Sequence, residues 1–209
     1  MSIIVDNIVR KKTSSVKWDK MIEINKDENM LPFWIADSDY QTAPCIIETL
    51  TNRIQNGAFG YGVIGDDYYE AIIDWNKNKY KIILNKNDIF PETGVVTGLA
   101  ILIRALSKEN DGIIIMSPVY SPFFDLVLNQ NRKLLESPLI NNNGYFEMDF
   151  KDIESKLPFA KILIVCNPHN PVGRVYNKLE LDRLVNLCKN YGVFLISDEV
   201  HCDLILGDN

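Results

Sequence analysis

The sequence lacks any long apolar run and any cluster of basic residues. No segment approaches the ~20 consecutive apolar residues of a membrane-spanning helix, and the first fifteen residues do not contain the apolar core of a secretion signal. The 22 Lys and Arg residues are scattered and outnumbered by 28 Asp and Glu, so the formal charge is −6. Nucleic acid and anionic membranes bind localised basic surfaces. We therefore expect a cytoplasmic protein whose partner is neither nucleic acid nor membrane.

Patterned cysteines are also missing. The four cysteines, at positions 45, 166, 188 and 202, show no Cys-x-x-Cys spacing, and this is typical of reduced core cysteines. His201 and Cys202 could be combined with Cys166 into a metal site, but the usual ligand pattern is absent, so we predict no metal. No Gly-x-Gly-x-x-Gly segment follows an expected strand, which disfavours a dinucleotide-binding fold.

Alternating apolar strands and amphipathic helices occupy the second half of the chain. With 46% hydrophobic residues, the 209-residue chain can bury a substantial core. Continuous apolar strands separated by helices predict a mostly parallel sheet with helices on both faces, an α/β architecture. The expected strands are 112–118, 133–139, 160–166 and 193–199, and the expected helices are 95–110, 121–131, 149–157 and 177–192.

Local signals fix two of these helix ends. Ser121 followed by Pro122 predicts a helix start, since serine is a common N-cap and proline suits the first helical position. Gly192 predicts the end of the last helix, because glycine adopts the left-handed conformation of a C-cap readily. A polar Asn-Asn-Asn-Gly stretch at 141–144 predicts a turn.

Two expected strand ends offer an anion seat and an aromatic face. In parallel sheets, ligands bind in the crevice beyond the carboxyl ends of the strands. Gly94 at the start of a helix leaves backbone N–H groups free for a phosphate, although such a glycine is most often only a turn. Tyr120 lies between two prolines that fix the backbone; a core tyrosine is the simpler alternative for this residue.

Two further strand ends offer amides and carboxylates. Asn167 and Asn170 follow the strand at 160–166, and their side chains can donate to a ligand oxygen, although Asn-Pro pairs are also ordinary turn residues. Asp198 and Glu199 end the strand at 193–199, where a buried carboxylate is costly unless a cationic group pairs with it. Solvation at the strand end explains Glu199 better than Asp198.

The four strand ends together match one cofactor. Pyridoxal 5′-phosphate (PLP) has a phosphate, a flat ring, a phenolic oxygen and a pyridine nitrogen, which a buried carboxylate keeps protonated. A phosphate seat, an aromatic face, an amide donor and a carboxylate are the groups that this cofactor requires. We predict a PLP site at the carboxyl edge of the sheet.

Several longer motifs carry a family resemblance from about residue 16 to the last residue. They are "FWIADSDY", "FGYG", "TGVV", "SPVYSPFF", "CNPHNPVGR" and "SDEVHCDLI". These motifs resemble the cystathionine β-lyase (MalY/PatB) group of fold-type I, PLP-dependent enzymes of the aminotransferase class I/II superfamily. The resemblance implies the large domain of the aspartate aminotransferase-like fold.

The resemblance also implies roles at the cofactor. The backbone of Val95 and Val96 would bind the phosphate, and Tyr120 would stack on the ring. Asn170 would reach the phenolic oxygen, and Asp198 would pair with the pyridinium.

Other implied roles lie around the cofactor. His201 occupies a position near the phenolic oxygen, and Tyr61 would reach the phosphate of a neighbouring subunit. Ala36 and Asp37 would line the substrate side. The resemblance thus implies a homodimer that binds a small amino acid.

One part of the family pattern is absent. The Schiff-base lysine is expected some thirty residues beyond Asp198, past Asn209, so the chain resembles an N-terminal half and by itself would hold PLP only non-covalently. Residues 1–45 are expected to be an N-terminal arm and part of the small domain, and 46–209 an incomplete PLP-binding large domain. A strand at 88–91 is expected to find no sheet partner within the chain.

The implied reaction is β-elimination from cystathionine or another cysteine S-conjugate, giving a thiol, pyruvate and ammonia. Transamination uses the same groups and stays open as an alternative. A non-catalytic regulatory or binding protein is an alternative of a different class.

Overall fold

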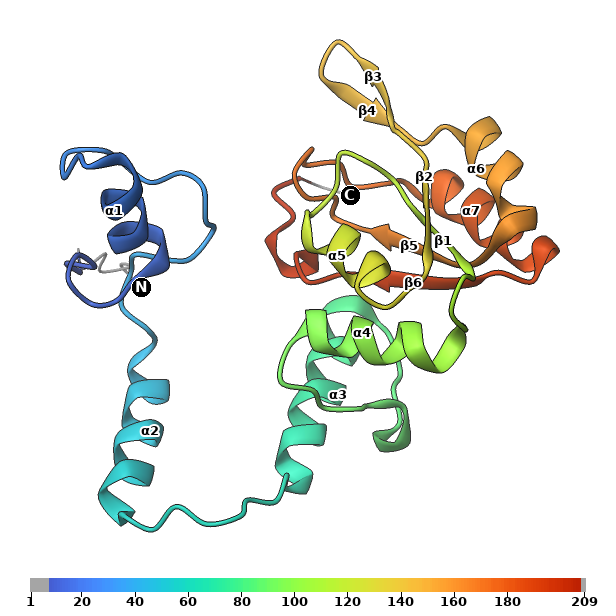
Figure 1. The fold of residues 1–209 in the computed structure, drawn as a ribbon. Coiled ribbons are helices and arrows are strands. Elements are labelled where there is room, and N and C mark those ends of the chain that lie inside the picture. The colour runs from blue at the N-terminus through green and yellow to red at the C-terminus, as the bar shows by residue number, and fades with distance from the viewer. Residues whose placement is uncertain (1–7, 208–209) are drawn as a thin grey trace. The chain divides into compact units, whose positions relative to one another are not determined.

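The computed structural model describes residues 8–207 and divides the chain into two compact units. The first unit ends at Tyr68 and the second begins at Tyr69. The second unit holds the sheet that the sequence predicts, and it is the larger body in Figure 1. The proposed domain boundary between residues 45 and 46 stays a prediction.

A four-stranded parallel sheet forms the centre of the second unit. Its order is β2-β1-β5-β6, and every pairing within it is parallel. This confirms the predicted α/β architecture. The strands are β1 (Gly112–Ile115), β2 (Lys133–Glu136), β5 (Ala160–Cys166) and β6 (Phe194–Asp198).

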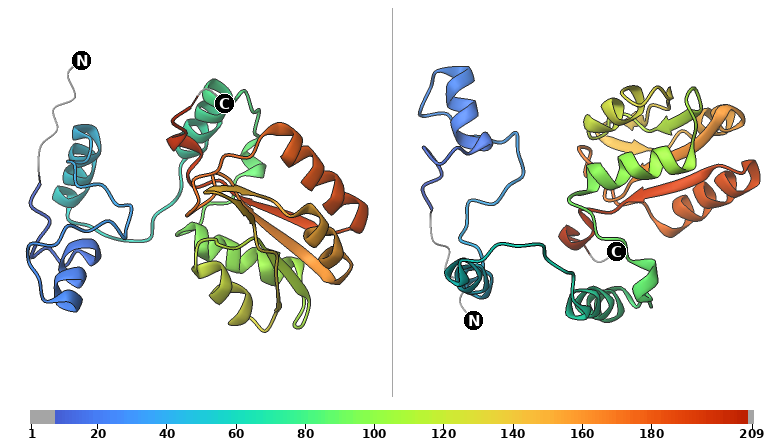
Figure 2. Two further views of the ribbon diagram at one scale, coloured as in Figure 1. Left: turned by 90° about the horizontal axis from the view of Figure 1, so that it is seen from above. Right: turned by 60° about the horizontal axis from the view of Figure 1, so that its bottom comes forward.

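Helices cover both faces of this sheet, as Figure 2 shows. Helices α4 (Val95–Leu106) and α5 (Pro122–Leu128) cover one face, and α6 (Phe150–Lys156) and α7 (Lys178–Tyr191) cover the other. Side chains alternate across the strands, so Ile113 and Ile115 pack against α4 and α5, whereas Ile114 packs against α6 and α7. Each face therefore has its own apolar core.

The helix ends follow their sequence signals. Ser121 and Pro122 occupy the predicted N-cap and first helical position of α5, although the Ser121 side chain makes no capping hydrogen bond. Asn177 and Glu180 form a reciprocal capping box at the start of α7. Gly192 ends α7 in the left-handed conformation, with φ 66°, as predicted.

Gly112 begins β1 because a larger residue does not fit there. A Cβ atom at this position would lie 2.2 Å from the backbone oxygen of Phe159 and 2.6 Å from Leu135 Cδ1. The glycine therefore allows β1 to lie close to β5 and β2.

Five sequence predictions need correction. The strand expected at 133–139 ends at Glu136, and the helix expected at 121–131 ends at Leu128. The strand expected at 112–118 ends at Ile115, and residues 116–118 already belong to the loop at the sheet edge. No strand forms at 88–91; Asp88 ends a short 3₁₀ turn and Phe90 is largely exposed, and no sheet pairing of these residues occurs within 8–207. The helix expected at 95–110 ends at Leu106, where the Ser107 backbone becomes extended.

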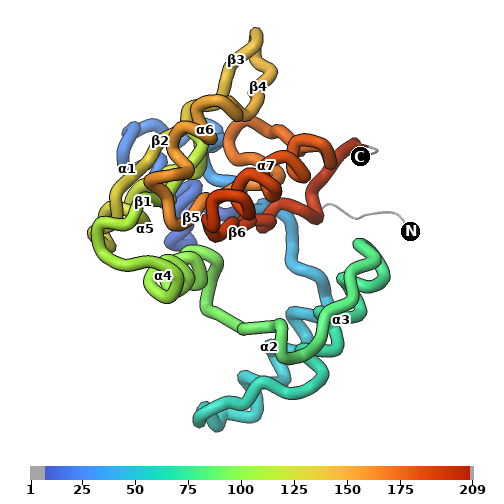
Figure 3. Tube along the Cα trace, turned by 90° about the vertical axis from the view of Figure 1, so that its right-hand side faces the viewer, coloured from blue at the N-terminus to red at the C-terminus, as the bar shows by residue number. Residues whose placement is uncertain are grey.

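An antiparallel hairpin follows β2. It consists of β3 (Ile140–Asn142) and β4 (Tyr145–Glu147) around the predicted polar turn, where Asn143 and Gly144 have positive φ. Figures 1 and 3 both show this hairpin projecting from the sheet.

Helix α3 (Asp66–Tyr80) is anchored at its end to the segment that follows β6. Trp75 Nε1 and Lys79 Nζ donate to Asp203 Oδ1 at 3.3 and 2.7 Å, and the Tyr80 hydroxyl donates to the same oxygen. Asp203 belongs to a short 3₁₀ turn (Cys202–Leu204), so this cluster fixes the chain two residues beyond His201.

An ion-pair cluster organises part of the first unit. Lys17 Nζ donates to Asp39 Oδ2 at 2.8 Å, and Arg10 pairs with Asp37 at 2.9 Å. Trp18 Nε1 also donates to Asp39, at 2.8 Å. The first unit further contains α1 (Met21–Asn25) and α2 (Pro44–Asn56). No helix among residues 8–207 is long and apolar enough to cross a membrane.

Candidate functional site

The carboxyl edge of the sheet gathers the loops that follow β1, β5 and β6. The strands are parallel neighbours, so their last residues lie along one edge. Two hydrogen bonds join the loops: Asn167 N–H donates to the Asp198 carbonyl at 2.9 Å, and a ring nitrogen of His169 lies 3.0 Å from the Pro118 carbonyl. The predicted clustering of strand ends is therefore present.

Asp198 is a buried carboxylate without a cationic partner. It is the last residue of β6 and only 6% exposed. Its Oδ1 accepts the Val200 N–H at 3.1 Å, and no ion pair to it is found in the part of the chain that the structure describes. Its neighbour Glu199 is exposed and accepts the Ser197 hydroxyl. Burying an unpaired carboxylate is costly, so Asp198 is suited to a cationic ligand atom.

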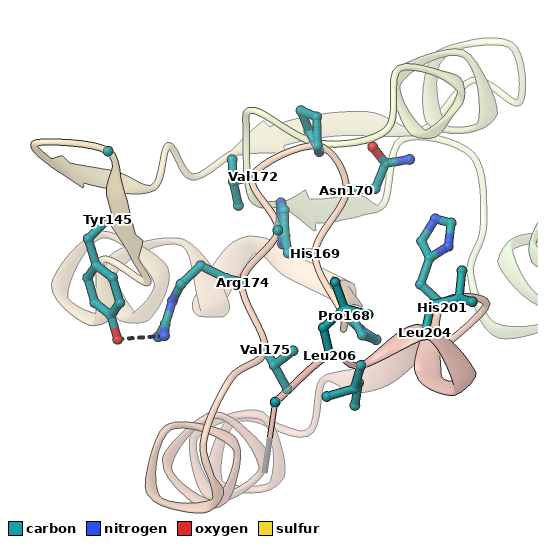
Figure 4. A pocket seen from close by; sticks show the side chains of 15 residues that line it. Tyr145, Pro168, His169, Asn170, Val172, Arg174, Val175, His201, Leu204 and Leu206 are labelled. Carbon is teal, nitrogen blue, oxygen red and sulfur yellow. Dashed lines mark hydrogen bonds between the residues drawn. The ribbon is translucent and has the colours of Figure 1, made fainter. Parts of the chain in front are cut away.

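Asn170 and His201 line one open pocket at this edge. Figure 4 shows it, with walls from the 168–175 loop and the segment after β6. No hydrogen bond from either side chain to another described residue is found, so the Asn170 amide and the His201 ring are available to a ligand.

The neighbouring Asn167 is engaged within the loop. Its side-chain oxygen accepts the Tyr176 N–H at 3.0 Å, which fixes the end of the loop. The strand-end pattern offers both asparagines as candidates for a ligand, and the family resemblance implies Asn170. The structure distinguishes them, because the amide oxygen of Asn167 already has a structural partner.

Helix α4 presents its N-terminus at the same edge. The helix packs on the sheet through Leu99 and Ile103 and leads directly into β1, so it runs antiparallel to the strands (Figure 1). Gly94 is its N-cap and supplies no side-chain cap, and the space that a Cβ would take there is open. The first N–H groups, at Val95 and Val96, have no intrahelical acceptor. Free donors, the helix dipole and open space suit an anion.

Tyr120 lies in the loop after β1. Its ring is 40% exposed and packs edge-on against Phe123, with the centroids 6.0 Å apart and an angle of 86° between the planes. Phe123 is fully buried, so it fixes one edge of the Tyr120 ring. The tyrosine is thus a supported and partly exposed aromatic group rather than a core residue.

The remaining predicted residues belong to the first unit. Tyr61 is fully exposed there. Asp37 uses its carboxylate to pair with Arg10, and its carbonyl accepts Lys17 Nζ at 2.8 Å. Ala36 precedes it in the same segment. The structure does not place these three residues relative to the sheet edge, so their roles stay predictions.

The buried thiol of Cys166 supports the loop after β5, a role that no signal in the sequence indicates. Cys166 Sγ lies 3.4 Å from the Pro168 carbonyl and 3.5 Å from Asn170 N, so the thiol donates to the former and accepts from the latter. Burial raises the pKa of Cys166, the Asn170 N–H opposes this, and the Asp198 charge raises it further. The thiol therefore stays neutral beside Asp198 and positions the Asn170 backbone.

These features define an α/β protein with a ligand site at the carboxyl edge of a parallel sheet. Residues 28–209 match the family "Aminotransferase class I and II", and the chain belongs to this family.

Named relatives agree with this membership. The chain is 38% identical to cystathionine β-lyase PatB of Bacillus subtilis, covering 93% of this chain and 51% of the relative. It is 32% identical to protein MalY of Escherichia coli, covering 95% and 52%. The chain spans about half the length of the curated relatives that it matches.

Solved structures agree as well. A PLP-bound protein of Clostridium difficile 630 superposes with a TM-score of 0.93 at 41% identity, covering 98% of this chain and 53% of that one. Cystalysin of Treponema denticola, which contains PLP, gives 0.92 at 33% identity with the same coverage. The predicted fold class is confirmed.

Proposed function

We propose that residues 28–209 form the PLP-binding part of a carbon-sulfur β-lyase. The substrates are amino acids that carry sulfur on Cβ, such as cystathionine and other cysteine S-conjugates, and the products are a thiol, pyruvate and ammonia. The observation that carries the proposal is the buried Asp198 carboxylate, for which no cationic partner is found among the described residues. It ends β6 at the same sheet edge where the unengaged Asn170 and His201 side chains line a pocket. Support for the reaction comes from relatives named as cystathionine β-lyases.

The groups at the sheet edge fit the cofactor. The N-terminus of α4, at Gly94, Val95 and Val96, would bind the phosphate. Tyr120 would face the ring, and Asp198 would pair with the pyridine nitrogen. Asn170 and His201 would lie on the side of the phenolic oxygen, in the pocket between the 168–175 loop and the segment after β6.

Each side chain has a physical task in this arrangement. PLP, when bound, supplies an electron sink that makes bonds at the substrate's Cα and Cβ easier to break. Asp198 would hold a proton on the pyridine nitrogen, and its burial strengthens that charge pair because little water screens it. Tyr120 would limit tilting of the cofactor ring, because the tyrosine ring is itself held in place by its contact with Phe123. The amide of Asn170 would donate to the phenolic oxygen.

Several further assignments stay predictions. These are the homodimer, the cytoplasmic location, the domain division at residue 45, and the contributions of Tyr61, Ala36 and Asp37. The covalent lysine is still predicted beyond Asn209.

Transamination is the second candidate. The matched family bears the aminotransferase name, and the Clostridium difficile protein is provisionally named an aminotransferase. The same side chains would serve either reaction, because both begin with loss of the Cα proton. The fate of sulfur separates the two, since only elimination releases a thiol.

Product analysis of the complete gene product tests the proposal. We expect release of thiol and pyruvate in equal amounts from cystathionine or another cysteine S-conjugate, in the presence of PLP. Asp198→Ala should lose most of this activity, whereas Glu199→Gln should retain it, because Glu199 is exposed and next in sequence. Transfer of the amino group to an added oxo acid, with no thiol released, would favour the aminotransferase instead.

A further inference from the structure

His169 is a buried histidine that joins two loops of the site. It is 2% exposed and lies between Pro168 and Asn170. Its Nε2 lies 3.0 Å from the Pro118 carbonyl oxygen, and its Nδ1 lies 3.1 Å from the Tyr176 hydroxyl. Tyr176 is 3% exposed and meets the ring edge-on, with the centroids 5.8 Å apart. Both ring nitrogens are therefore engaged in a dry environment.

The partners fix the tautomer of the ring. A carbonyl oxygen only accepts hydrogen bonds, so Nε2 must carry the hydrogen that points to Pro118. In a neutral ring Nδ1 is then the acceptor, and the Tyr176 hydroxyl donates to it. A second ring proton would leave the buried hydroxyl proton of Tyr176 without this acceptor.

The two loops joined by His169 are those that carry the proposed cofactor contacts. Pro118 lies two residues before Tyr120, and His169 precedes Asn170 directly. The His169 backbone is also held: its N–H donates to the Arg174 carbonyl at 2.7 Å, and its carbonyl accepts from Gly173 at 2.8 Å. With both backbone and ring fixed, a shift of one loop must move the other.

We propose that His169 is a positioning residue, which as the neutral Nε2–H tautomer holds the Tyr120 loop and the Asn170 loop at a fixed separation. This inference rests on the proposed function, in which Tyr120 faces the cofactor ring and Asn170 reaches its phenolic oxygen. His169 is itself buried, with both ring nitrogens engaged by the protein, and acts through these two residues.

Two substitutions of His169 separate the effects of its two hydrogen bonds, because each keeps one bond and removes the other. In His169→Gln the longer amide reaches the Pro118 carbonyl and keeps the bond between the loops, but it loses the acceptor for Tyr176. In His169→Asn the shorter side chain keeps an acceptor near Tyr176 and loses the bond to Pro118. Tyr176→Phe is a milder third variant that leaves the ring in place.

Nuclear magnetic resonance of the histidine rings tests the geometry directly. The chain contains only two histidines, His169 and His201, so His201→Gln assigns both sets of signals. We expect a slowly exchanging ring N–H at Nε2 of His169 at neutral pH, with Nδ1 unprotonated. A ring of mixed tautomers, or one whose N–H exchanges at the solvent-exposed rate, would overturn the inference.

Titration of the 209-residue chain with PLP tests the positioning role. For His169→Asn we expect a rise of roughly tenfold in the dissociation constant, about what one lost hydrogen bond costs, and His169→Gln should restore most of the affinity. A merely structural histidine would give affinities that follow the unfolding free energies of the variants, and equal affinities for His169→Asn and the wild type would also overturn the role. If the wild type shows the expected ring signal but binds no PLP, the proposed function fails and the contact between the loops stands.

Discussion

Asp198 lies opposite Cys166 in the register between β6 and β5, and the two strands end together at this pair. The carboxylate of one residue and the thiol of the other are both buried, and burial raises the pKa of the Cys166 thiol, so the thiol stays neutral. The pair places a lone negative charge in an apolar sheet end. Such a charge weakens folding unless a ligand supplies the opposite one.

Asp198→Asn should therefore not destabilise the unliganded chain. Asn keeps an oxygen for the Val200 N–H and removes the buried charge, so we expect the free energy of unfolding to stay constant or rise by about 1 kcal/mol. Urea denaturation measures it, with Glu199→Gln as the exposed control. A fall of more than about 1 kcal/mol would mean that Asp198 has a cationic partner within the protein.

Gly94→Ala should stabilise the chain and weaken anion binding. The Gly94 backbone is extended and open space surrounds the site of a Cβ, so alanine should add about 0.4 to 1 kcal/mol through the unfolded state. Its methyl group would occupy the space in front of the α4 N–H groups, and the dissociation constant for PLP should rise roughly tenfold.

Gly98→Ala is the matched control for Gly94→Ala. It lies inside the same helix, where a Cβ meets only ordinary contacts with Glu92, and alanine should stabilise the helix by about 1 kcal/mol. PLP affinity should stay unchanged in this variant. Equal effects of the two substitutions on PLP affinity would mean that the N-terminus of α4 does not bind the phosphate.

The stability of the chain should fall as the pH drops below about 6.5. Burial lowers the pKa of His169 in the folded state, so the unfolded chain binds the proton more tightly and stability rises with pH across the interval between the two pKa values. The groups that face the ring are the backbone carbonyls of Pro118, Cys166 and Met116 and the Tyr176 hydroxyl. The carbonyls oppose the effect of burial on the pKa of His169, and burial raises the pKa of the Tyr176 hydroxyl.

His169→Gln isolates this contribution. The contribution of His169 cannot exceed about 1.4 kcal/mol per pH unit, the limit for one proton. Urea denaturation between pH 5 and pH 8 (a range set by the ~6.5 reference value) should show a smaller slope for the variant than for the wild type. Identical slopes for the variant and the wild type would mean that His169 does not cause the pH dependence of stability.

The free edge of β6 should promote association of the chain. The other edge strand, β2, has Lys133 and Glu136 at its ends, whereas β6 begins with Phe194, which is 45% exposed. Exposed apolar edge strands pair with further strands. Light scattering should show a mass that grows with concentration, and Phe194→Glu should reduce this growth. Association that is insensitive to Phe194→Glu would place the contact elsewhere.

The sequence predicts those parts of the fold whose signals are local. Apolar runs and caps identify β5, β6 and α7, because each signal lies within a few residues of the element that it defines. The β3–β4 hairpin was not predicted, since its strands have three residues each and are mostly polar or exposed. Helices α2 and α3 were not predicted either, and none of their residues is buried.

The residues of the candidate site likewise differ in whether a local sequence signal indicates them. Asp198 is visible in the sequence because a carboxylate ends an apolar strand. The partner of His169 is not, because Pro118 lies 51 residues away and contributes only a backbone oxygen. The cluster at Asp203 spans more than 120 residues, and no periodic pattern relates groups so far apart.

Equilibrium titration of the 209-residue chain with PLP, followed by the change in cofactor absorbance, tests the central claim most directly. We expect saturable binding at one site by the wild type and by Glu199→Gln. Asp198→Asn should bind more weakly by roughly tenfold to a hundredfold, the cost of losing one charge-assisted hydrogen bond. No saturable binding by the wild type, or equal affinity for Asp198→Asn and Glu199→Gln, would contradict a PLP site at the carboxyl edge of the sheet.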